Sequence, residues 1–393
     1  MNYMKKIGIV TITSARNNSF NYGNILQNYA LTEYLRNLNF DVETIYYSST
    51  VPTFTLQQRH TKKYSGNILQ FIDDIFRVIN RKINSKILQD KKTCRSDMFW
   101  DFINLHISYT SESYSETSDM KKLNSLFDFF IVGSDQVWNP YYEGSNEFFY
   151  LGFADKHKRL TYAPSIGVDH IPNEMIEKMR RWLNQIPDVS IREAEGKEIL
   201  SSVFNLKSTL VCDPVFLLNK EQWLQVAKTE IKKDKYFVVY ILGKKTVETN
   251  RYIKKLEKYY GLKSFDLYTR DDPNSLFCGP AEFIGLIAGA EFVFTDSFHG
   301  TAFSLIFERP VVIIDRNASN KKSSYKMNGR IDNILKLAGL DNRNVQNLMM
   351  KKENLYQVYS VKGTDLEKLI CSSKDYIKHL FERNGEFDDK HTS

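Results

Sequence analysis

A histidine stands among small polar residues in the hexapeptide Thr-Asp-Ser-Phe-His-Gly, residues 295–300. The flanking apolar residues predict a strand at Phe292–Phe294 and a helix at Ala302–Phe307. In an open parallel sheet such a loop lies at the carboxyl ends of the strands, where the next helix offers free N–H groups to an anion. His299 is placed there to contact a phosphate or to move a proton. In the alternative, Ser297 only caps the helix and the imidazole is satisfied by protein partners.

A second polar loop follows the all-apolar run Phe127–Val132, which predicts a buried strand. Asp135 in this loop is a candidate general base toward a hydroxyl group. Its neighbours would line a sugar site through hydrogen bonds and stacking: Ser134, Gln136, Trp138 and Asn139. An ordinary turn, with Trp138 in the core, is the alternative.

An arginine with a serine two residues before it ends another expected strand, Asp188–Glu195. Because side chains alternate along a strand, Ser190 and Arg192 are predicted on one face and Glu193 on the other. Arg192 can then grip a carboxylate or a phosphate with two parallel hydrogen bonds. A solvated surface pair between Arg192 and Glu193 is the alternative.

Small and amide residues mark two more loops that two facing domains would bring to one cleft. Asn21, Gly23 and Asn24 precede a helix, where we expect Asn24 to cap and Gly23 to let a ligand approach closely. Ser165 stands near the end of the expected strand Arg159–Gly167. Plain capping and turn formation are the alternatives.

These loops need a framework of alternating strands and helices, and the sequence provides one in each half. At 393 residues the chain is longer than one hydrophobic core usually organises. The alternation predicts an α/β protein with mainly parallel sheets, built as two Rossmann-like domains facing a cleft. We expect domains at 1–190, with a helical insertion, and at 191–362, followed by a helix and a disordered tail at 363–393.

The segment Gln57–Tyr109 is basic and aromatic and marks the insertion. It predicts helices at Ile68–Ile87 and around Met98–Leu105. Packing is the expected role of this segment. Contact with an acceptor or with a membrane surface is the alternative.

Composition indicates a folded cytoplasmic protein. No apolar run reaches the roughly 18 residues of a membrane-spanning helix, and the apolar segment Ile7–Ile12 is too short for a signal peptide. The four cysteines are far apart, so we expect reduced thiols and no metal site. The net charge of +7 is scattered, which argues against nucleic acid. A solvated surface with a locally positive pocket for a small anion accounts for this charge equally well.

Motifs of other enzyme classes are missing from the sequence. There is no Walker loop, G-x-G-x-x-G, G-x-S-x-G or H-E-x-x-H. Hydrolase and metalloenzyme chemistry are therefore disfavoured. The polar loops suit a small ligand with two or three negative charges better than a nucleotide.

Seven segments occur in an order shared with a known enzyme family. They are NYGNILQNYAL, FDFFIVGSDQVWNP, YAPSIG, SIREAEG, VCDPVFLL, EFIGLIAGAEFVFTDSFHGTAFSLIFERP and SSYKMNGRIDNIL, within roughly Lys6 to Leu340. GSDQVWN and DSFHGT are the most specific. Together they resemble the polysaccharide pyruvyl transferase family. The resemblance implies a fold similar to that of GT-B glycosyltransferases, with the acceptor on the first domain and the donor, phosphoenolpyruvate, on the second.

The resemblance also implies a function. Enzymes of this family transfer the pyruvate group of phosphoenolpyruvate to a sugar of a bacterial surface polysaccharide or its precursor, as a ketal. The implied acceptor is a glycan or a lipid-linked sugar, met in the cytoplasm or at the inner face of the membrane, and no cofactor is implied. A nucleotide-sugar glycosyltransferase and a non-catalytic protein that binds anionic glycans are the alternatives. Peripheral membrane association and the oligomeric state stay open.

Position by position, the resemblance gives His299 and Arg192 contacts to the donor, and places Asp135 near the reacting groups. We expect His299 to bind phosphate and donate a proton, and Asp135 to act as the base. Other residues implied at the donor are Ser190, Ser297, Phe298, Gly300 and Thr301. Several members have Arg-Leu-His where this chain has Ser-Phe-His, so a cationic donor contact is either absent from this chain or supplied by another residue, such as Arg330 or Lys244.

Overall fold

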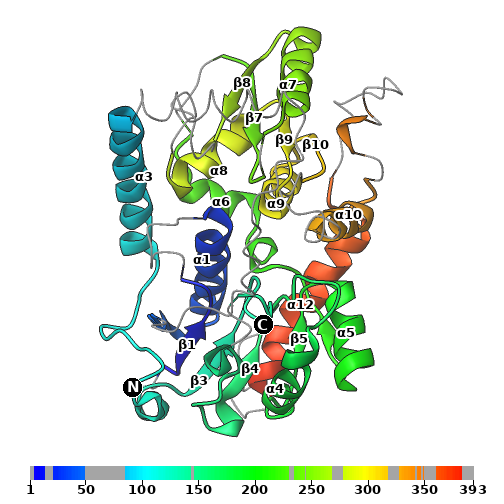
Figure 1. Cartoon of the computed structure of the whole chain (residues 1–393). Helices are drawn as coiled ribbons and strands as arrows, with labels where there is room; N and C mark the ends of the chain where they lie inside the picture. The colour runs from blue at the N-terminus through cyan, green and yellow to red at the C-terminus, as the bar shows by residue number, and fades with distance from the viewer. Residues whose placement is uncertain are drawn as a thin grey trace, which may run out of the picture.

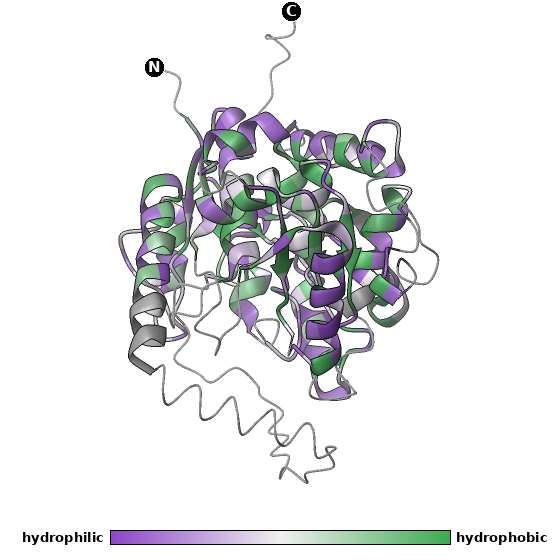
Figure 2. Cartoon of the chain, turned by 90° about the horizontal axis from the view of Figure 1, so that it is seen from above, coloured by the Kyte–Doolittle hydropathy of each residue, from purple (hydrophilic) through white to green (hydrophobic). Residues whose placement is uncertain are grey.

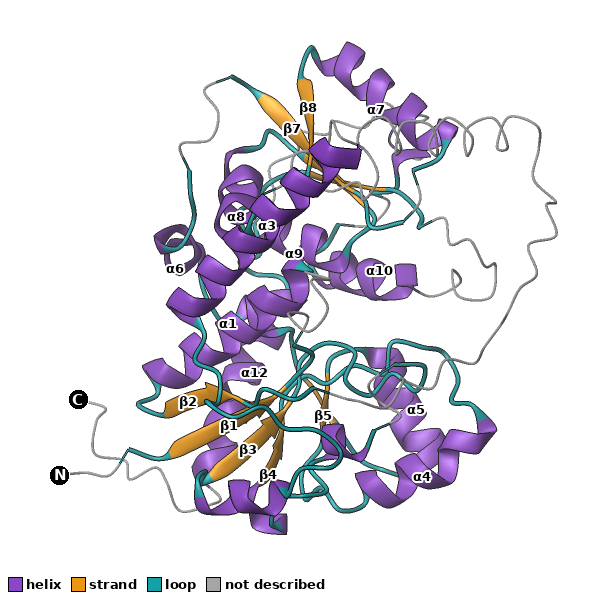
Figure 3. Cartoon of the chain, turned by 60° about the vertical axis from the view of Figure 1, so that its left-hand side comes forward, coloured by secondary structure: helices purple, strands orange, loops and turns teal. Residues whose placement is uncertain are grey.

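Apolar runs of the sequence form the strands of two parallel sheets, one in each of two stacked lobes (Figure 1). In this computed structural model, each sheet lies at the centre of its lobe with helices around it (Figure 3). The structure describes residues 4–13, 21–48, 85–142, 146–229, 234–243, 245–267, 278–316, 327–340, 343–346, 348 and 360–382.

The first lobe is built on a four-stranded sheet of order β2-β1-β3-β4. All its strands pair in parallel, as expected for the alternation of strands and helices. The strands are β1 (Lys6–Val10), β2 (Asp41–Thr44), β3 (Phe129–Val132) and β4 (Arg159–Thr161). Around them lie α1 (Tyr22–Asn37), α4 (Asn173–Leu183) and the short 3-10 turns η2 (Met120–Ser125), η4 (Glu147–Tyr150) and η5 (Lys156–Lys158). Helix α3 (Ser85–His106) instead lies beside α8 (Pro280–Gly289) of the second lobe (Figure 1).

The second lobe repeats this plan with a sheet of order β10-β9-β7-β8, again all parallel. Its strands are β7 (Tyr236–Tyr240), β8 (Lys263–Asp266), β9 (Val293–Thr295) and β10 (Val311–Ile313). Its helices are α6 (Lys220–Gln225), α7 (Val247–Tyr260), α8 (Pro280–Gly289), α9 (Phe298–Ile306) and α10 (Met327–Leu337). Hydrophobic colour gathers on the strands in Figure 2, whereas hydrophilic colour marks much of the outer helix surface.

Before the chain passes to the second lobe, it forms a small unit that belongs to the first lobe. Strands β5 (Ser190–Ile191) and β6 (Thr209–Leu210) pair in parallel around α5 (Ala194–Phe204). Ile191 and Leu200 pack in the same apolar core as Val10 of β1. The chain therefore passes to the second lobe after β6, through the turn η6 (Pro214–Phe216), and later than the expected boundary between residues 190 and 191.

Helix α1 joins the lobes. Its first residue, Tyr22, stacks on Phe283 of α8 with ring centroids 4.4 Å apart, and the Tyr22 hydroxyl donates to the Cys278 carbonyl oxygen at 2.5 Å. One continuous apolar core includes residues of both sheets along this side. Part of the space expected as an open cleft is thus filled by packed side chains.

The last described helix, α12 (Asp365–Glu382), returns from the second lobe to the first (Figure 1). It packs beside α10, and its Phe381 ring lies 4.3 Å from the Phe40 ring and 5.7 Å from the Phe129 ring. The predicted helix at the end of the chain is thus present. It fastens the second lobe to the first.

Two expected elements differ from the structure in ways that move site residues. The strand expected at Asp188–Glu195 is only the two residues of β5, because α5 begins at Ala194. The helix expected from Ala302 begins at Phe298, because the Ser297 side chain caps it there. His299 therefore stands in the first turn of α9 rather than in a loop.

Several expectations concern residues outside the described part of the chain. They are most of the helix at Ile68–Ile87, the disordered tail and the cation Lys244. In the ranges that the structure describes, no helix is long and apolar enough to cross a bilayer.

Replacing Phe381 by Ala removes the side chain that anchors α12 on the first lobe. Because Phe381 is fully buried, we expect the free energy of unfolding to fall by about 3–5 kcal/mol in urea denaturation. Lys378→Ala, at an exposed position on the same helix, is the control and should change it by no more than about 0.5 kcal/mol. Equal effects of the two substitutions would contradict the anchoring role.

Candidate active site

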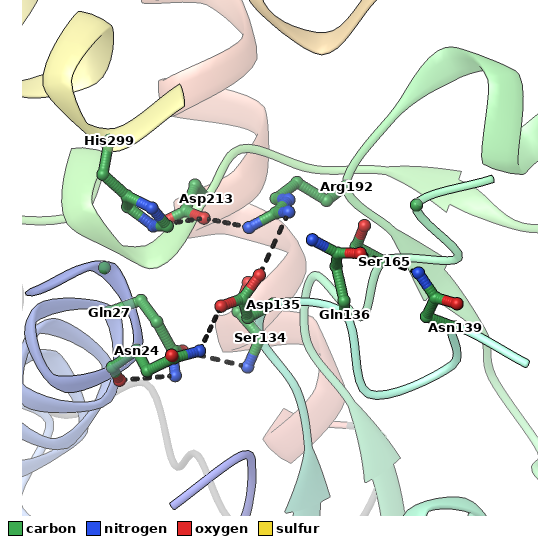
Figure 4. A network of polar contacts seen from close by, with 12 residues as sticks. Asn24, Gln27, Ser134, Asp135, Gln136, Asn139, Ser165, Arg192, Asp213 and His299 are labelled. Carbon is green, nitrogen blue, oxygen red and sulfur yellow. Dashed lines mark hydrogen bonds and ion pairs between the residues drawn. The ribbon is translucent and has the colours of Figure 1, made fainter. Parts of the chain in front are cut away.

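A buried carboxylate lies where the chain crosses between the lobes. Asp213 stands directly before η6, and its Oδ1 accepts a hydrogen bond from the Val215 N–H at 3.1 Å. Its Oδ2 accepts from Nη1 of Arg192 at 2.6 Å and lies 3.6 Å from Nε2 of His299. Figure 4 shows the three side chains converging from different elements. Asp213 thus connects a cation of the first lobe with an imidazole of the second.

The electrostatic state of Asp213 follows from these contacts. Burial alone raises the pKa of this carboxyl, but His299, the Arg192 guanidinium and the Val215 N–H together hold it well below its usual value. Asp213 is therefore ionised across the physiological pH range. It can stabilise positive charge on the imidazole.

Arg192 is enclosed by three carboxylates. Besides Asp213, its Nη2 lies 3.5 Å from Asp135, and its Nε lies 3.8 Å from Glu193. Burial opposes the charge of Arg192, but these carboxylates outweigh it and raise the pKa of the guanidinium. One face of the guanidinium is covered by the ring of Phe298, 4.9 Å away. The interpretation of Arg192 as a solvated surface residue is therefore wrong.

His299 lies against the first turn of α1. A Cβ added at Gly23 would stand only 2.1 Å from Nδ1 of His299, so the ring occupies the space that any other residue would fill. Nε2 faces Asp213, and Nδ1 is the ring atom nearest to Gly23. Gly23 was expected to let a ligand approach. In this structure it makes room for His299.

Asp135 completes the cluster from the first lobe. It follows β3 with a left-handed φ of 63°, a conformation that non-glycine residues rarely adopt outside special sites. Its Oδ2 accepts a short hydrogen bond from the Asn24 side chain. Asn21, rather than Asn24, caps α1 by accepting from the Gly23 N–H at 2.9 Å. Asn24 is therefore free of the capping role expected for it and holds Asp135.

A cavity of about 260 Å³ opens beside this cluster. Arg192, Asp213 and Phe298 form its wall toward His299, and α10 supplies Arg330. Most of the remaining lining residues, from α5, β6, η6, α10 and α12, are apolar; the polar ones are Glu193, Asn333, Lys336 and Asp365. Within the described part of the chain, no group of three or more His, Cys, Asp or Glu side chains is arranged to hold a metal ion.

Several expected ligand contacts are corrected by the structure. Four hydroxyl-bearing residues are fully buried and donate to protein oxygens: Ser134 to the Ala163 carbonyl, Ser165 to Glu193, Ser190 to the Thr161 carbonyl, and Thr301 to the Ser297 carbonyl. These hydroxyls stabilise turns and the start of α9. They do not face the cavity.

The prediction that Trp138 lines a sugar site is wrong. The indole is fully buried, stacks on Tyr150 with centroids 5.7 Å apart, and donates to the Phe149 carbonyl at 2.8 Å. Asn139 is almost buried and donates to the Gln136 side chain at 2.7 Å. This contact links two predicted cleft residues to each other within the loop.

The remaining predicted donor residues shape the start of α9. The Ser297 hydroxyl accepts from the Gly300 N–H at 3.4 Å, as the capping alternative predicted. A Cβ at Gly300 would lie 2.6 Å from Oγ1 of Thr295, so only glycine fits against β9. Phe298 is partly exposed and lines the cavity.

Asp213 had no role assigned from the sequence. The signal was present, because this carboxylate follows the short strand β6 as the other polar loops follow their strands. In the sequence, Asp213 is only part of an expected strand and of the segment VCDPVFLL. Its central position depends on Arg192 and His299, which are distant in sequence.

A comparison with sequence families shows which family the chain belongs to. Residues 21–317 match the family model described as polysaccharide pyruvyl transferase, which spans every residue of the cluster. The chain belongs to the polysaccharide pyruvyl transferase family. No curated protein sequence is recognisably similar to this pyruvyl transferase family member.

Solved structures show what the family member's fold is similar to. UDP-GlcNAc 2-epimerase from Methanocaldococcus jannaschii superposes with a TM-score of 0.50 at 13% identity, over 96% of this chain and 99% of that one. A structure described as UDP-N-acetylglucosamine 2-epimerase from Listeria monocytogenes gives 0.51 at 10% identity, over 99% and 98%. At such identities the likeness concerns the fold alone. The predicted pair of Rossmann-like domains, as in GT-B enzymes, is confirmed.

Asp213→Asn should destabilise this pyruvyl transferase family member in a pH-dependent way. Because the folded-state pKa of Asp213 is lowered, its carboxylate contributes stability that is present above about pH 4 and lost as the pH falls. We expect the variant to be about 3 kcal/mol less stable at pH 7, with a difference that shrinks below about pH 4 in urea denaturation.

The control for this measurement is Asp155→Asn, an exposed carboxylate whose side chain makes no cap hydrogen bond. It should leave the stability unchanged across the same pH range. A wild-type advantage over Asp213→Asn that stays constant from pH 7 to pH 3 would contradict the charged role of Asp213.

Proposed function

We propose that the protein transfers the pyruvate group of phosphoenolpyruvate to a sugar of a surface polysaccharide or its precursor and closes a cyclic ketal. The observation that carries the proposal is the convergence of His299, Arg192 and Asp135 around Asp213, beside a cavity. Membership of the family supports the transferred group and the sugar acceptor. The acceptor on this proposal is a glycan or a lipid-linked sugar in the cytoplasm or at the membrane surface.

The reaction needs an acid, a base and a group that holds anions. Protonation of the phosphoenolpyruvate methylene makes the enol carbon electrophilic, and a sugar hydroxyl adds to that carbon while losing its proton. The C–O bond to phosphate then breaks, and a second hydroxyl of the same sugar forms the second ketal bond. The products are the cyclic ketal and inorganic phosphate, so no oxidant or cofactor is required.

His299 is suited to the acid role. Its Nδ1 is the ring nitrogen turned away from Asp213, and the ionised carboxylate opposite stabilises the imidazolium before the proton is given up. Its place in the first turn of α9 adds the positive end of the helix dipole, which favours an anionic donor.

Asp135 is suited to the base role on the acceptor side. The Asn24 amide and the Arg192 guanidinium orient its two oxygens, and its carboxylate lies at the edge of the first lobe. Arg192 faces the cavity and connects the base to Asp213. Acid and base are thus parts of one network of hydrogen bonds and ion pairs (Figure 4).

Replacing His299 by Ala should lower phosphate release from phosphoenolpyruvate by about 10²–10⁴-fold, because the general acid is lost. Phosphate release and the mass of the glycan product would be followed with a panel of glycan acceptors. His379→Ala, at an exposed position on α12, is the matched control and should keep the wild-type rate. Consumption of a nucleotide sugar while phosphoenolpyruvate is ignored would contradict the proposed function.

Gly23→Ala should affect the reaction through His299 without touching the substrate. The new methyl group would push the imidazole out of position, and a displacement of about 1 Å is enough to lower turnover about 10²-fold. Gly329→Ala is the matched control, since the Cβ there meets only the flexible end of Glu195 at 3.2 Å. Unchanged turnover in Gly23→Ala would show that the position of His299 does not matter.

A further inference from the structure

Among the described residues, one arginine at the cavity has no ion-pair partner. Arg330 stands on α10, and Asn333, Ile334 and Leu337 of the same helix also line the cavity. These positions recur at intervals of three and four residues, so one face of α10 forms the wall opposite Arg192. In the ranges that the structure describes, Arg330 makes no hydrogen bond or ion pair.

The carboxylates that line the cavity are already engaged. Asp213 accepts from Arg192 at 2.6 Å. Oε1 of Glu193 accepts from the Ser165 hydroxyl at 2.9 Å and from the N–H groups of Ile166 and Gly167 at 2.8 and 3.1 Å. Asp365 pairs with Lys368 at 2.8 Å. Oε2 of Glu193 makes no hydrogen bond and lies 3.8 Å from Nε of Arg192, and within the described residues none of the three carboxylates forms an ion pair with Arg330.

Two features of its surroundings disfavour the charged form of Arg330. Burial, and next the like charge of Arg192, lower its pKa to about 10, and the negative charges of Glu193 and Asp135 compensate only in part. Arg192 itself is neutralised by the three carboxylates around it. Among the described residues, Arg330 is therefore a cation of the cavity wall without an ion-pair partner, whereas Lys336, which also lines the cavity, is exposed to solvent. An anionic ligand would relieve both the burial of Arg330 and its repulsion with Arg192.

We propose that Arg330 is the second cation of the donor site and binds one of the two anionic groups of the donor. The inference rests on the proposed function, because it takes the donor to be a phosphate that also carries a carboxylate. A guanidinium suits either group, since it offers planar, paired hydrogen bonds. Ser297 at the start of α9 has only a hydroxyl, so α10 rather than α9 supplies this cation.

The test is the affinity for phosphoenolpyruvate of the full chain, measured by calorimetry for wild type, Arg330→Gln and Arg330→Lys. We expect Arg330→Gln to bind at least about tenfold more weakly, the value of one charge-assisted hydrogen bond, and Arg330→Lys to fall between. The same calorimetry with methyl phosphate, which lacks the carboxylate, should give weaker binding to wild type than phosphoenolpyruvate does. Arg251→Gln, the same chemical change at an exposed position on α7, should bind like wild type.

Thermal unfolding without ligand separates binding from a structural role. Because Arg330 is an unbalanced cation, ligand-free Arg330→Gln should be at least as stable as wild type. Wild-type affinity in Arg330→Gln, or a clearly lower unfolding temperature of this variant without ligand, would overturn the inference and leave the proposed function standing. No binding of phosphoenolpyruvate to wild type would overturn both.

Discussion

The carboxylate of Asp213 lies between a guanidinium and an imidazole that come from opposite lobes. Its Oδ2 lies 2.6 Å from Nη1 of Arg192 and 3.6 Å from Nε2 of His299, so this carboxylate is a polar link between the lobes. A buried carboxylate is costly unless it is paired, so each of the three groups is stable only while the others stay in place. The site therefore forms only when both lobes are folded and packed together.

Several elements of the fold position the residues of this site. Parallel strands end at one edge of each sheet, which brings the residues after β3 and β9 toward the junction. Helix α1 crosses that junction, and its Gly23 leaves room for the imidazole while Asn24 holds Asp135. The apolar contact of Tyr22 with Phe283 fixes α1 beside the second lobe. Packing and polar contacts thus position the same helix.

The sequence predicted the α/β lobes and the proximity of His299, Arg192 and Asp135, because strand periodicity and loop position depend on local residues. It did not reveal the role of Asp213, because that role depends on contacts with Arg192 and His299, which are distant in sequence. Nor did the sequence show whether Trp138 is buried or stacks on a ligand, because the residues around it fit either role. The start of α9 was misplaced because the cap at Ser297 competed with an apolar pattern that begins later.

A crystal structure of the full chain with phosphoenolpyruvate tests the account most directly, because the account requires the donor to meet groups from both lobes. The predicted result is a donor in the cavity beside α10, with His299 Nδ1 within hydrogen-bond distance of it and Asp213 still between His299 and Arg192. A donor bound elsewhere, or a bound state in which Asp213 no longer connects Arg192 with His299, would contradict the account.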